Sequence, residues 1–482
     1  MEESLKEKTA KGLFWGGVNN LTQQVVGVVF GIVMARWLLQ PEDYGMVAMI
    51  AVFTLVASTL QNSGFRSALI NQPEIRHEDY NSVFWFNILM GGSLYVILFL
   101  CAPLIARYYH TPELLWLSRY AFLAFVFASF GTAQSAYLTK RMMVKEIAQT
   151  GIVAILSSSL IGVFMAWMGF AYWALATQSI VFIGMNTLLL WVYSDWRPSL
   201  HIDFDPVKRM FGFSVKLLIS SIVNQINTNV MNILLGRYYN AQQVGYYNQA
   251  YQWSFKAYYF VQGMVMQIDQ TVLAGLNSER ERQLAVLRKM VRFTAFVSFP
   301  LLFGFGIVSH EFILLTIKDT WEPSVPLLRI LCVSGAFMPL SVLLFDFVIS
   351  RGRSDIYMWN TIALGLCLIA AMWLLHPYGI RTMVWGFAAI NISWTFVWFF
   401  FVRHLAGYRL RDFLKDTLPF ALTAAAVMAV TYSATAMISQ LWLVLLARIA
   451  MAAALYYVVM RIARVKILDD CIQFFVKKLK KS

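Results

Sequence analysis

The sequence predicts an all-α polytopic membrane protein with about 14 transmembrane helices. Hydrophobic residues make up 59% of its 482 residues and charged residues only 13%, whereas a soluble domain averages about 25% charged residues. The net charge of +14 would suggest nucleic acid in a soluble protein, but the Lys and Arg residues stand between apolar stretches. Lipid is therefore the expected solvent for most of the chain, and no nucleic-acid partner is expected.

The spans are recognised as runs of about 20 mostly apolar residues. Six form the first half, at 13–39, 43–70, 80–107, 113–139, 146–168 and 170–193. Eight more lie at 211–236, 244–270, 289–309, 324–350, 356–375, 382–402, 416–437 and 440–463. Outside them remain a start at 1–12, a linker at 194–210 and a basic amphipathic tail at 464–482, which we expect to lie on anionic lipid.

The basic residues predict an orientation in the membrane. If the N-terminus is cytoplasmic, the even-numbered loops return to the cytoplasm, and these contain "TKRMMVKE", "NSERERQLAVLRKM", "SRGRSD" and "RHLAGYRLRDFLKD". Loops on the other side, such as "HPYGIRT", are short and hold few Lys or Arg. This positive-inside bias predicts cytoplasmic N- and C-termini.

No pattern in the sequence indicates catalysis, a metal site or a cofactor. The four cysteines, Cys101, Cys332, Cys367 and Cys471, have neither metal-ligand nor redox spacing. The six histidines form no metal-spacing pair, and no Gly-rich phosphate loop precedes a Lys-Ser/Thr pair. The loops between spans are short and lack a catalytic constellation. We therefore expect a protein that is not an enzyme.

One helix–turn–helix phrase occurs twice. "MARWLLQPEDYGMVAM" covers 34–49 and "LLGRYYNAQQVGYYNQA" covers 234–250, and each places a small residue and an arginine before a polar turn and a glycine, Gly45 or Gly245. An even number of predicted spans separates the copies, so both face the same way across the membrane. A parallel repeat of this kind predicts halves related by an axis along the membrane normal, with a site between them. Chance recurrence of Arg and Gly at helix ends is the alternative.

The four spans that adjoin the repeated turns carry polar side chains. The candidate binding residues are Asn20, Gln24, Asn62, Arg66, Lys216, Asn224, Asn227, Gln249, Gln252, Lys256 and Tyr259. Steps of three or four, with Ser220 between Lys216 and Asn224, place those of each span on one helix face. Because ionisable groups are costly in hydrocarbon, we expect these faces to line a wet cavity.

Other interpretations stay open for single residues. The amides could hydrogen-bond between packed helices, and Arg66 and Lys216, near helix ends, could extend to the interface. Lys256 lies near the middle of its span, which favours a cavity role. Asp269 and Asp346 could each pair with a nearby Lys or Arg, or hold a coupling proton or cation.

The cavity that these residues describe has a surplus of positive charge. Lys and Arg neutralise phosphate and donate hydrogen bonds to it, while amides and tyrosines offer sugar hydroxyls both donors and acceptors. A cavity open sideways to lipid would let an acyl or prenyl chain stay in the bilayer. The residue types therefore predict a cargo in which phosphate links a glycan to a lipid.

Five phrases are spread in order over most of the chain. They are "ARWLLQPEDYG" (35–45), "LQNSGFRSALINQ" (60–72), "AYLTKRMMVKEIA" (136–148), "LLGRYYNAQQVGYYNQA" (234–250) and "WEPSVPLLRILCVSG" (321–335). In these phrases the chain resembles the polysaccharide transporters, or oligosaccharide flippases, of the multidrug/oligosaccharidyl-lipid/polysaccharide flippase superfamily.

The resemblance implies a six-helix N-lobe at 13–193 and a six-helix C-lobe at 211–402 around a central cavity, with two further helices at 403–463. It implies alternating access that turns a polyprenyl-diphosphate-linked oligosaccharide from the cytoplasmic to the outer leaflet of the bacterial inner membrane. Cavity cations would hold the diphosphate, and Arg66, Lys216 and Lys256 are the matching candidates. The glycan would serve O-antigen, capsule or exopolysaccharide, with glycosyltransferases and a glycan polymerase as pathway partners.

Three rival functions stay open at this point. A drug/cation antiporter of the same superfamily should prefer an acidic cavity, whereas the polar faces here carry Lys and Arg. A membrane glycan polymerase or ligase would need catalytic groups in a sizeable loop. In a membrane scaffold that transports nothing, the costly cations at membrane depth would have no function.

Overall fold

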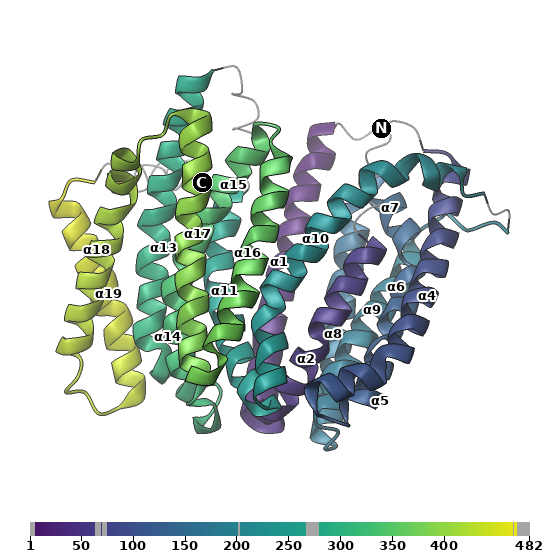
Figure 1. Cartoon of the computed structure of the whole chain (residues 1–482), viewed down its shortest axis with the longest axis horizontal. Helices are drawn as coiled ribbons and strands as arrows, with labels where there is room; N and C mark the ends of the chain where they lie inside the picture. The colour runs from purple at the N-terminus through teal and green to yellow at the C-terminus, as the bar shows by residue number, and fades with distance from the viewer. Residues whose placement is uncertain are drawn as a thin grey trace. The chain divides into compact units, whose positions relative to one another are not determined.

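The computed structural model describes residues 5–62, 69, 75–200, 203–266, 279–465 and 467–469, which form helices joined by short connections (Figure 1). In this part of the chain, 11 helices are long and apolar enough to cross a membrane, or 12 if a bent pair counts as one span. The protein is therefore a multi-pass all-α membrane protein, as predicted. The number fourteen is not confirmed, because α10 (Asp205–Tyr238) and α11 (Ala241–Met266), rich in amides and tyrosines, are not among these spans.

The chain divides into two compact units, Met1–Gly245 and Tyr246–Ser482. Most of α11 belongs to the second unit, and only its first turn belongs to the first. The lobe boundaries drawn from the resemblance, at 13–193 and 211–402, stay a prediction.

The helices of the first unit follow the predicted spans. They are α1 (Leu5–Val33), α2 (Pro41–Asn62), α4 (His77–Tyr109), α8 (Val144–Trp167), α9 (Tyr172–Tyr193) and α10. A five-residue π-helix, η1 (Met34–Leu38), ends α1 within the first copy of the repeated phrase.

One predicted span of the first unit is broken. Residues 113–139 form α5 (Leu114–Ala121), α6 (Leu123–Ser129) and α7 (Thr132–Lys140), with a 42° bend before α7. Gly131 stands at the bend, and a Cβ on it would lie 3.0 Å from Thr187 Oγ1 of α9. The bent segment can therefore pack closely on α9 because this residue has no side chain.

The linker that follows α9 is fastened to α4. Trp196 Nε1 donates a hydrogen bond to His77 Nδ1 at 3.1 Å, and Ser199 N donates to Asn81 Oδ1 at 2.9 Å. In return, Trp85 Nε1 donates to Ser199 O at 2.8 Å. The start of the predicted linker is thus part of the packed first unit rather than a free connection.

The second unit is arranged around one long helix, α13 (Arg280–Thr316). The helices that follow are η2 (Asp319–Trp321), α14 (Ser324–Gly335), α15 (Met338–Ser350), α16 (Ser354–Leu375), η3 (His376–Tyr378), α17 (Ile380–Ala406), α18 (Leu410–Ala434) and α19 (Leu441–Ile462). Of these, α14, α15, α18 and α19 pack on α13, and Figure 1 shows α18 and α19 beside it. The predicted span 324–350 breaks after α14, where Ser298 Oγ donates to Ala336 O at 2.8 Å.

A carboxylate on α18 ties that helix to α13. Asp416, whose side chain is 5% exposed, accepts a hydrogen bond from Arg288 Nε at 2.8 Å and lies 3.4 Å from Arg292 Nε. The Tyr408 hydroxyl also donates to Asp416 Oδ2, at 2.7 Å. Burial and this hydrogen bond raise the pKa of the Tyr408 phenol well above its usual value, so the phenol stays a donor.

We expect Asp416→Ala to lower the free energy of unfolding by about 2–3 kcal/mol, because two arginines and a phenol lose their common acceptor. A lower apparent melting temperature in detergent would measure the effect. Asp355→Ala is the matched control, since it removes a carboxylate whose pair with Arg353, at 2.9 Å, is exposed. Equal shifts in the two variants would contradict the structural role of Asp416.

Candidate functional site

Three of the predicted binding residues share one face of α11. Gln252 and Tyr259 are exposed, and Lys256 lies between them, partly buried, at steps of four and three along the helix. Lys256 Nζ lies 4.5 Å from the centre of the Trp253 ring, a cation–π contact. No carboxylate of a described residue pairs with Lys256. The face therefore offers an amide, an uncompensated ammonium group and a phenol.

A ladder of aromatic rings runs along α11 beside these residues. Tyr247, Tyr251, Phe255 and Tyr259 follow one another at steps of four, with ring centres 6.0, 6.2 and 5.4 Å apart and planes 26°, 28° and 18° from parallel. Tyr247 is buried, whereas Tyr259 is 46% exposed. The ladder thus leads from the packed interior to an open ring. Of the four, only Tyr259 was among the residues predicted to bind, although their spacing of four residues is visible in the sequence.

The remaining predicted residue of this helix, Gln249, is 5% exposed and belongs to the packed side. On α10, Asn224 is exposed and Asn227 is buried. Two further amides that the sequence analysis did not select, Asn229 and Asn232, are also buried. Asn229 Nδ2 donates to Gln225 O at 3.0 Å, a bond within the same helix. The amides of α10 and α11 therefore divide into a packed set and an exposed set.

The predicted residues of α1, Asn20 and Gln24, are exposed. Their sequence neighbours Asn19 and Gln23 form a pair on the packed side of the helix, in which Gln23 Nε2 donates to Asn19 Oδ1 at 2.9 Å. This pair lies against Gly151 of α8, where a Cβ would be 2.7 Å from Asn19 Oδ1. The helix thus uses one pair of amides for packing and leaves the predicted pair open.

Four predicted residues, Asn62, Arg66, Lys216 and Asp269, lie outside the described side chains. Asp346 on α15 is described, and it is 5% exposed without forming an ion pair to another described residue. Both roles considered for this carboxylate therefore stay predictions. The shared cavity lined by all the candidate residues also stays a prediction.

The two repeated turns touch each other in the first unit. A Cβ built on Gly45, in the first turn of α2, would lie 1.7 Å from Ala241 O. One built on Gly245, in the first turn of α11, would lie 1.8 Å from Pro41 O. Pro41 and Ala241 hold corresponding places in the two phrases, so the contact is reciprocal, as a two-fold relation requires. Glycine recurs in the phrase because each turn meets the backbone of the other.

Gly236 and Arg237, just before the second turn, contact the neighbouring helices α2 and α4. A Cβ on Gly236 would lie 2.7 Å from Tyr109 Cε1 and 3.0 Å from Met49 Cγ, so its small size admits both side chains. Arg237 Nη1 donates to Tyr108 O at 2.6 Å, at the end of α4. The small residue and the arginine of the phrase therefore serve packing around the turn.

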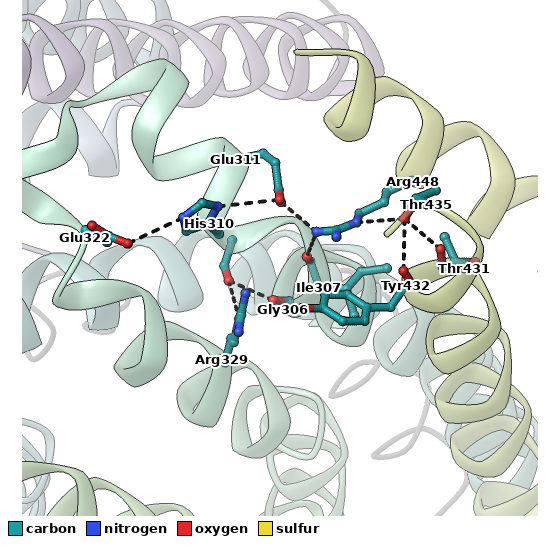
Figure 2. A network of polar contacts seen from close by, with 11 residues as sticks. Gly306, Ile307, His310, Glu311, Glu322, Arg329, Thr431, Tyr432, Thr435 and Arg448 are labelled. Atoms are coloured by element: carbon teal, nitrogen blue, oxygen red, sulfur yellow. Dashed lines mark hydrogen bonds and ion pairs between the residues drawn. The ribbon is translucent and has the colours of Figure 1, made fainter. Parts of the chain in front are cut away.

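A charged network in the second unit escaped the sequence analysis (Figure 2). Arg448 on α19 is 5% exposed, and its Nη1 lies 2.9 Å from Glu311 Oε2 on α13. The same guanidinium donates to Ile307 O at 2.8 Å and to Thr435 Oγ1 at 3.1 Å. The sequence signal that could have found this network is Arg448 itself, because an arginine within an apolar span needs a partner.

The sequence matches the profile of the family described as "Polysaccharide biosynthesis protein" over residues 33–326, more than half of the chain. The chain belongs to this family. The resemblance to polysaccharide transporters is thereby confirmed.

The chain is 25% identical over 430 residues to the teichuronic acid biosynthesis protein TuaB of Bacillus subtilis (strain 168), with 88% of each chain covered. It is 26% identical over 429 residues to the lipopolysaccharide biosynthesis protein WzxC of Escherichia coli (strain K12), with 87% of this chain and 86% of the relative covered.

The fold of this family member is similar to that of the lipid II flippase MurJ in an inward closed conformation. The TM-score is 0.77, covering 95% of this chain and 100% of MurJ. Sequence identity is only 14%, so the likeness concerns the fold.

We expect Gly45→Ala and Gly245→Ala each to destabilise the protein by about 1–3 kcal/mol, because the added methyl group would overlap a backbone carbonyl and force the turns apart. Thermal unfolding in detergent measures this. Gly92→Ala in α4 is the control, since a Cβ there meets no atom within 4 Å, and alanine favours a helix more than glycine does. Unchanged stability of both turn variants would contradict the close contact.

Proposed function

We propose that this protein is a flippase that moves a polyprenyl-diphosphate-linked oligosaccharide from the cytoplasmic to the outer leaflet of the bacterial inner membrane. The glycan then supplies a surface polysaccharide such as O-antigen, capsule or exopolysaccharide. The observation that carries the proposal is the partly buried ammonium of Lys256, which has no carboxylate partner among the described residues of a chain from this family.

The names of similar proteins support this class of cargo. TuaB and WzxC are named for the biosynthesis of teichuronic acid and lipopolysaccharide, and MurJ is named as a flippase of lipid II. The first two names concern carbohydrate polymers, and the third concerns the movement of a lipid. A chain similar to all three is best explained as a mover of glycan-bearing lipid.

The diphosphate supplies a negative charge to compensate the ammonium group of Lys256. Removing an ammonium group from water is costly unless an opposite charge compensates it. The Trp253 ring offsets part of that cost, and an anionic cargo would offset more. Arg66 and Lys216 add positive charge in this proposal, while a drug cation would be repelled by it. The charge therefore favours a phosphate-bearing cargo over the cationic drugs of an antiporter.

The glycan is recognised by the remaining groups of the same face. The Gln252 amide both donates and accepts hydrogen bonds, as sugar hydroxyls require. The open Tyr259 ring, stacked on Phe255 at 5.4 Å, offers a flat apolar surface to the C–H face of a sugar, together with a hydroxyl group. Asn20, Gln24 and Asn224, which are also exposed, extend this amide-rich lining in the proposal.

Transport proceeds by rocking of an N-lobe at 13–193 against a C-lobe at 211–402. With cytoplasmic termini, as the positive-inside bias predicts, the turns at Gly45 and Gly245 lie on the outer side of the membrane. Their contact must then part before the cavity opens outward. Asp269 and Asp346 hold a coupling ion or pair with a basic residue, and glycosyltransferases and a polymerase act before and after the flippase.

We expect Lys256→Ala to reduce surface polysaccharide about tenfold, since a lost charge-assisted hydrogen bond to phosphate costs about 1.5–3 kcal/mol. Lys256→Arg should retain more export, because it keeps the charge. Lys318→Ala, at an exposed loop lysine, is the control. Surface glycan per cell, together with leaflet-resolved detection of the undecaprenyl-linked intermediate, measures the effect at matched protein levels in the membrane.

Normal export by Lys256→Ala would contradict the role of this residue. Drug resistance on overexpression with unchanged surface glycan would instead support an antiporter. Purified protein that joins lipid-linked glycan units would support a polymerase or ligase.

Replacing the open ring tests the sugar contact. Tyr259→Leu should lower export severalfold, because the flat stacking surface is lost, whereas Tyr259→Phe should retain most of it. Tyr378→Leu, at a tyrosine that is 73% exposed in η3, is the control. The same surface-glycan assay reports the result, and equal export by the Leu and Phe variants would argue against stacking.

A further inference from the structure

The C-terminal helix pair is joined to α13 by ion pairs near both ends of that helix, each with a buried carboxylate. Near its start, Arg288 pairs with Asp416 of α18 at 2.8 Å. Near its end, Glu311 pairs with Arg448 of α19 at 2.9 Å. About 35 Å of helix separates Arg288 from Glu311 at 1.5 Å per residue, close to the roughly 30 Å thickness of the hydrocarbon core. Helix α18 is therefore tied to α13 near one face of the membrane, and α19 is tied to it near the other.

A groove of about 490 Å³ lies between α13, α14 and α18. This volume is within the range of about 300–1,000 Å³ that is typical of small-ligand sites. Small residues hollow the groove, with Gly306 on α13 and the exposed Ala425 and Ala429 on α18. Phe303 and Ile307 add apolar walls. The Arg288–Asp416 pair joins α18 to α13, and Arg448 bonds both to Ile307 O and to Thr435, directly after α18. These contacts hold the two walls beside each other.

The polar end of the groove lies where its helices reach one membrane face. There α13 ends at Thr316, α14 begins at Ser324 and α18 ends at Ala434. The groove residues nearest to these helix ends are Arg329 and Tyr432. The opposite end of the groove is apolar, so the groove runs from the interface into the hydrocarbon.

Two arginines stand near this end, and they differ in their partners (Figure 2). Arg448 is paired with a carboxylate, because it bonds to Glu311 as well as to Ile307 O and Thr435. Arg329 is exposed, and its Nε donates to Ser309 Oγ at 3.2 Å. It forms no ion pair with a described residue, which leaves its terminal nitrogens able to bind an anion.

The charge around the groove selects the kind of anion. Arg448 and Glu311 neutralise each other, and Glu322, which is exposed, lies 3.6 Å from His310 on the same network. Among the described residues that line the groove, Arg329 is the single cation. One cation suits a phosphate diester with one negative charge, and it would compensate a diphosphate poorly. The guanidinium fork binds phosphate oxygens with two parallel hydrogen bonds.

We propose that this groove binds one anionic phospholipid of the surrounding bilayer, with its phosphate on Arg329 and one acyl chain along Gly306, Ala425 and Ala429. The site is independent of the transported cargo. It rests on the membrane fold and the groove, so it stands or falls separately from the flippase function.

Native mass spectrometry of the full chain, purified from membranes that contain phosphatidylglycerol, tests the proposal. We expect the wild-type protein to retain one phosphatidylglycerol molecule. Ala425→Trp should fill the groove and reduce retention about tenfold, whereas Ala426→Trp, at the adjacent exposed alanine outside the groove, should not. Arg329→Gln should also reduce retention about tenfold, the loss expected for one charge-assisted contact, and Arg381→Gln, at another exposed arginine, should not.

A photoactivatable acyl chain on phosphatidylglycerol locates the site. Crosslinks should concentrate on peptides of α13, α14 and α18, and they should disappear in Ala425→Trp. Equal lipid retention by the Ala425→Trp and Ala426→Trp proteins would overturn the proposal. Displacement of the crosslinked phospholipid by a polyprenyl diphosphate at equal concentration would also overturn it, because the groove would then belong to the cargo.

Discussion

Lipid offers no hydrogen bonds and no counter-charges, so each charged side chain within the spans must find a partner in the protein or bind a ligand. In the described part of the chain, this constraint separates two kinds of residue. Arg448 with Glu311, and Arg288 with Asp416, meet it inside the protein and hold α13, α18 and α19 together. Lys256 has the Trp253 ring and no carboxylate partner among the described residues. The first kind builds the fold, and the second kind marks a place for an anionic ligand.

The same reasoning explains why a membrane protein keeps a costly buried ion pair. Breaking one partner of such a pair leaves an uncompensated charge, which is strongly destabilising even where the pair itself adds little. Near both ends of α13, pairs with a buried carboxylate fix the C-terminal helices, together with Tyr408 before α18 and Thr435 after it. A groove between fixed helices then keeps its shape, and this is the property that a resident lipid site needs.

The recurrence of one phrase at Gly45 and Gly245 has a local physical cause. Each glycine meets the backbone carbonyl of the residue that begins the other turn, Ala241 or Pro41. A side chain on either glycine would keep the turns apart. Glycine at the same place in both phrases therefore allows these two turns to contact each other reciprocally.

The site was only partly predictable, and the exposed amides show why. Helical spacing selected Asn20 and Gln24 on α1, but the neighbouring pair Asn19 and Gln23 is the one that packs against α8. A periodic pattern gives a helix face, and it does not say which neighbour covers that face. The same limit applied to Gln249 and Gln252, of which one is buried and the other exposed.

The sequence alone determined the membrane class and the family, and it located most of the helical segments, because apolar run length and composition act locally and need no tertiary contact. It also identified the repeated turns, since their glycines stand at fixed places in a phrase. Only the tertiary structure decided that these turns touch, that 113–139 and 324–350 break, and that Glu311 meets Arg448 across the chain. Such contacts join residues far apart in sequence, and no local pattern encodes which distant partner will satisfy a buried charge.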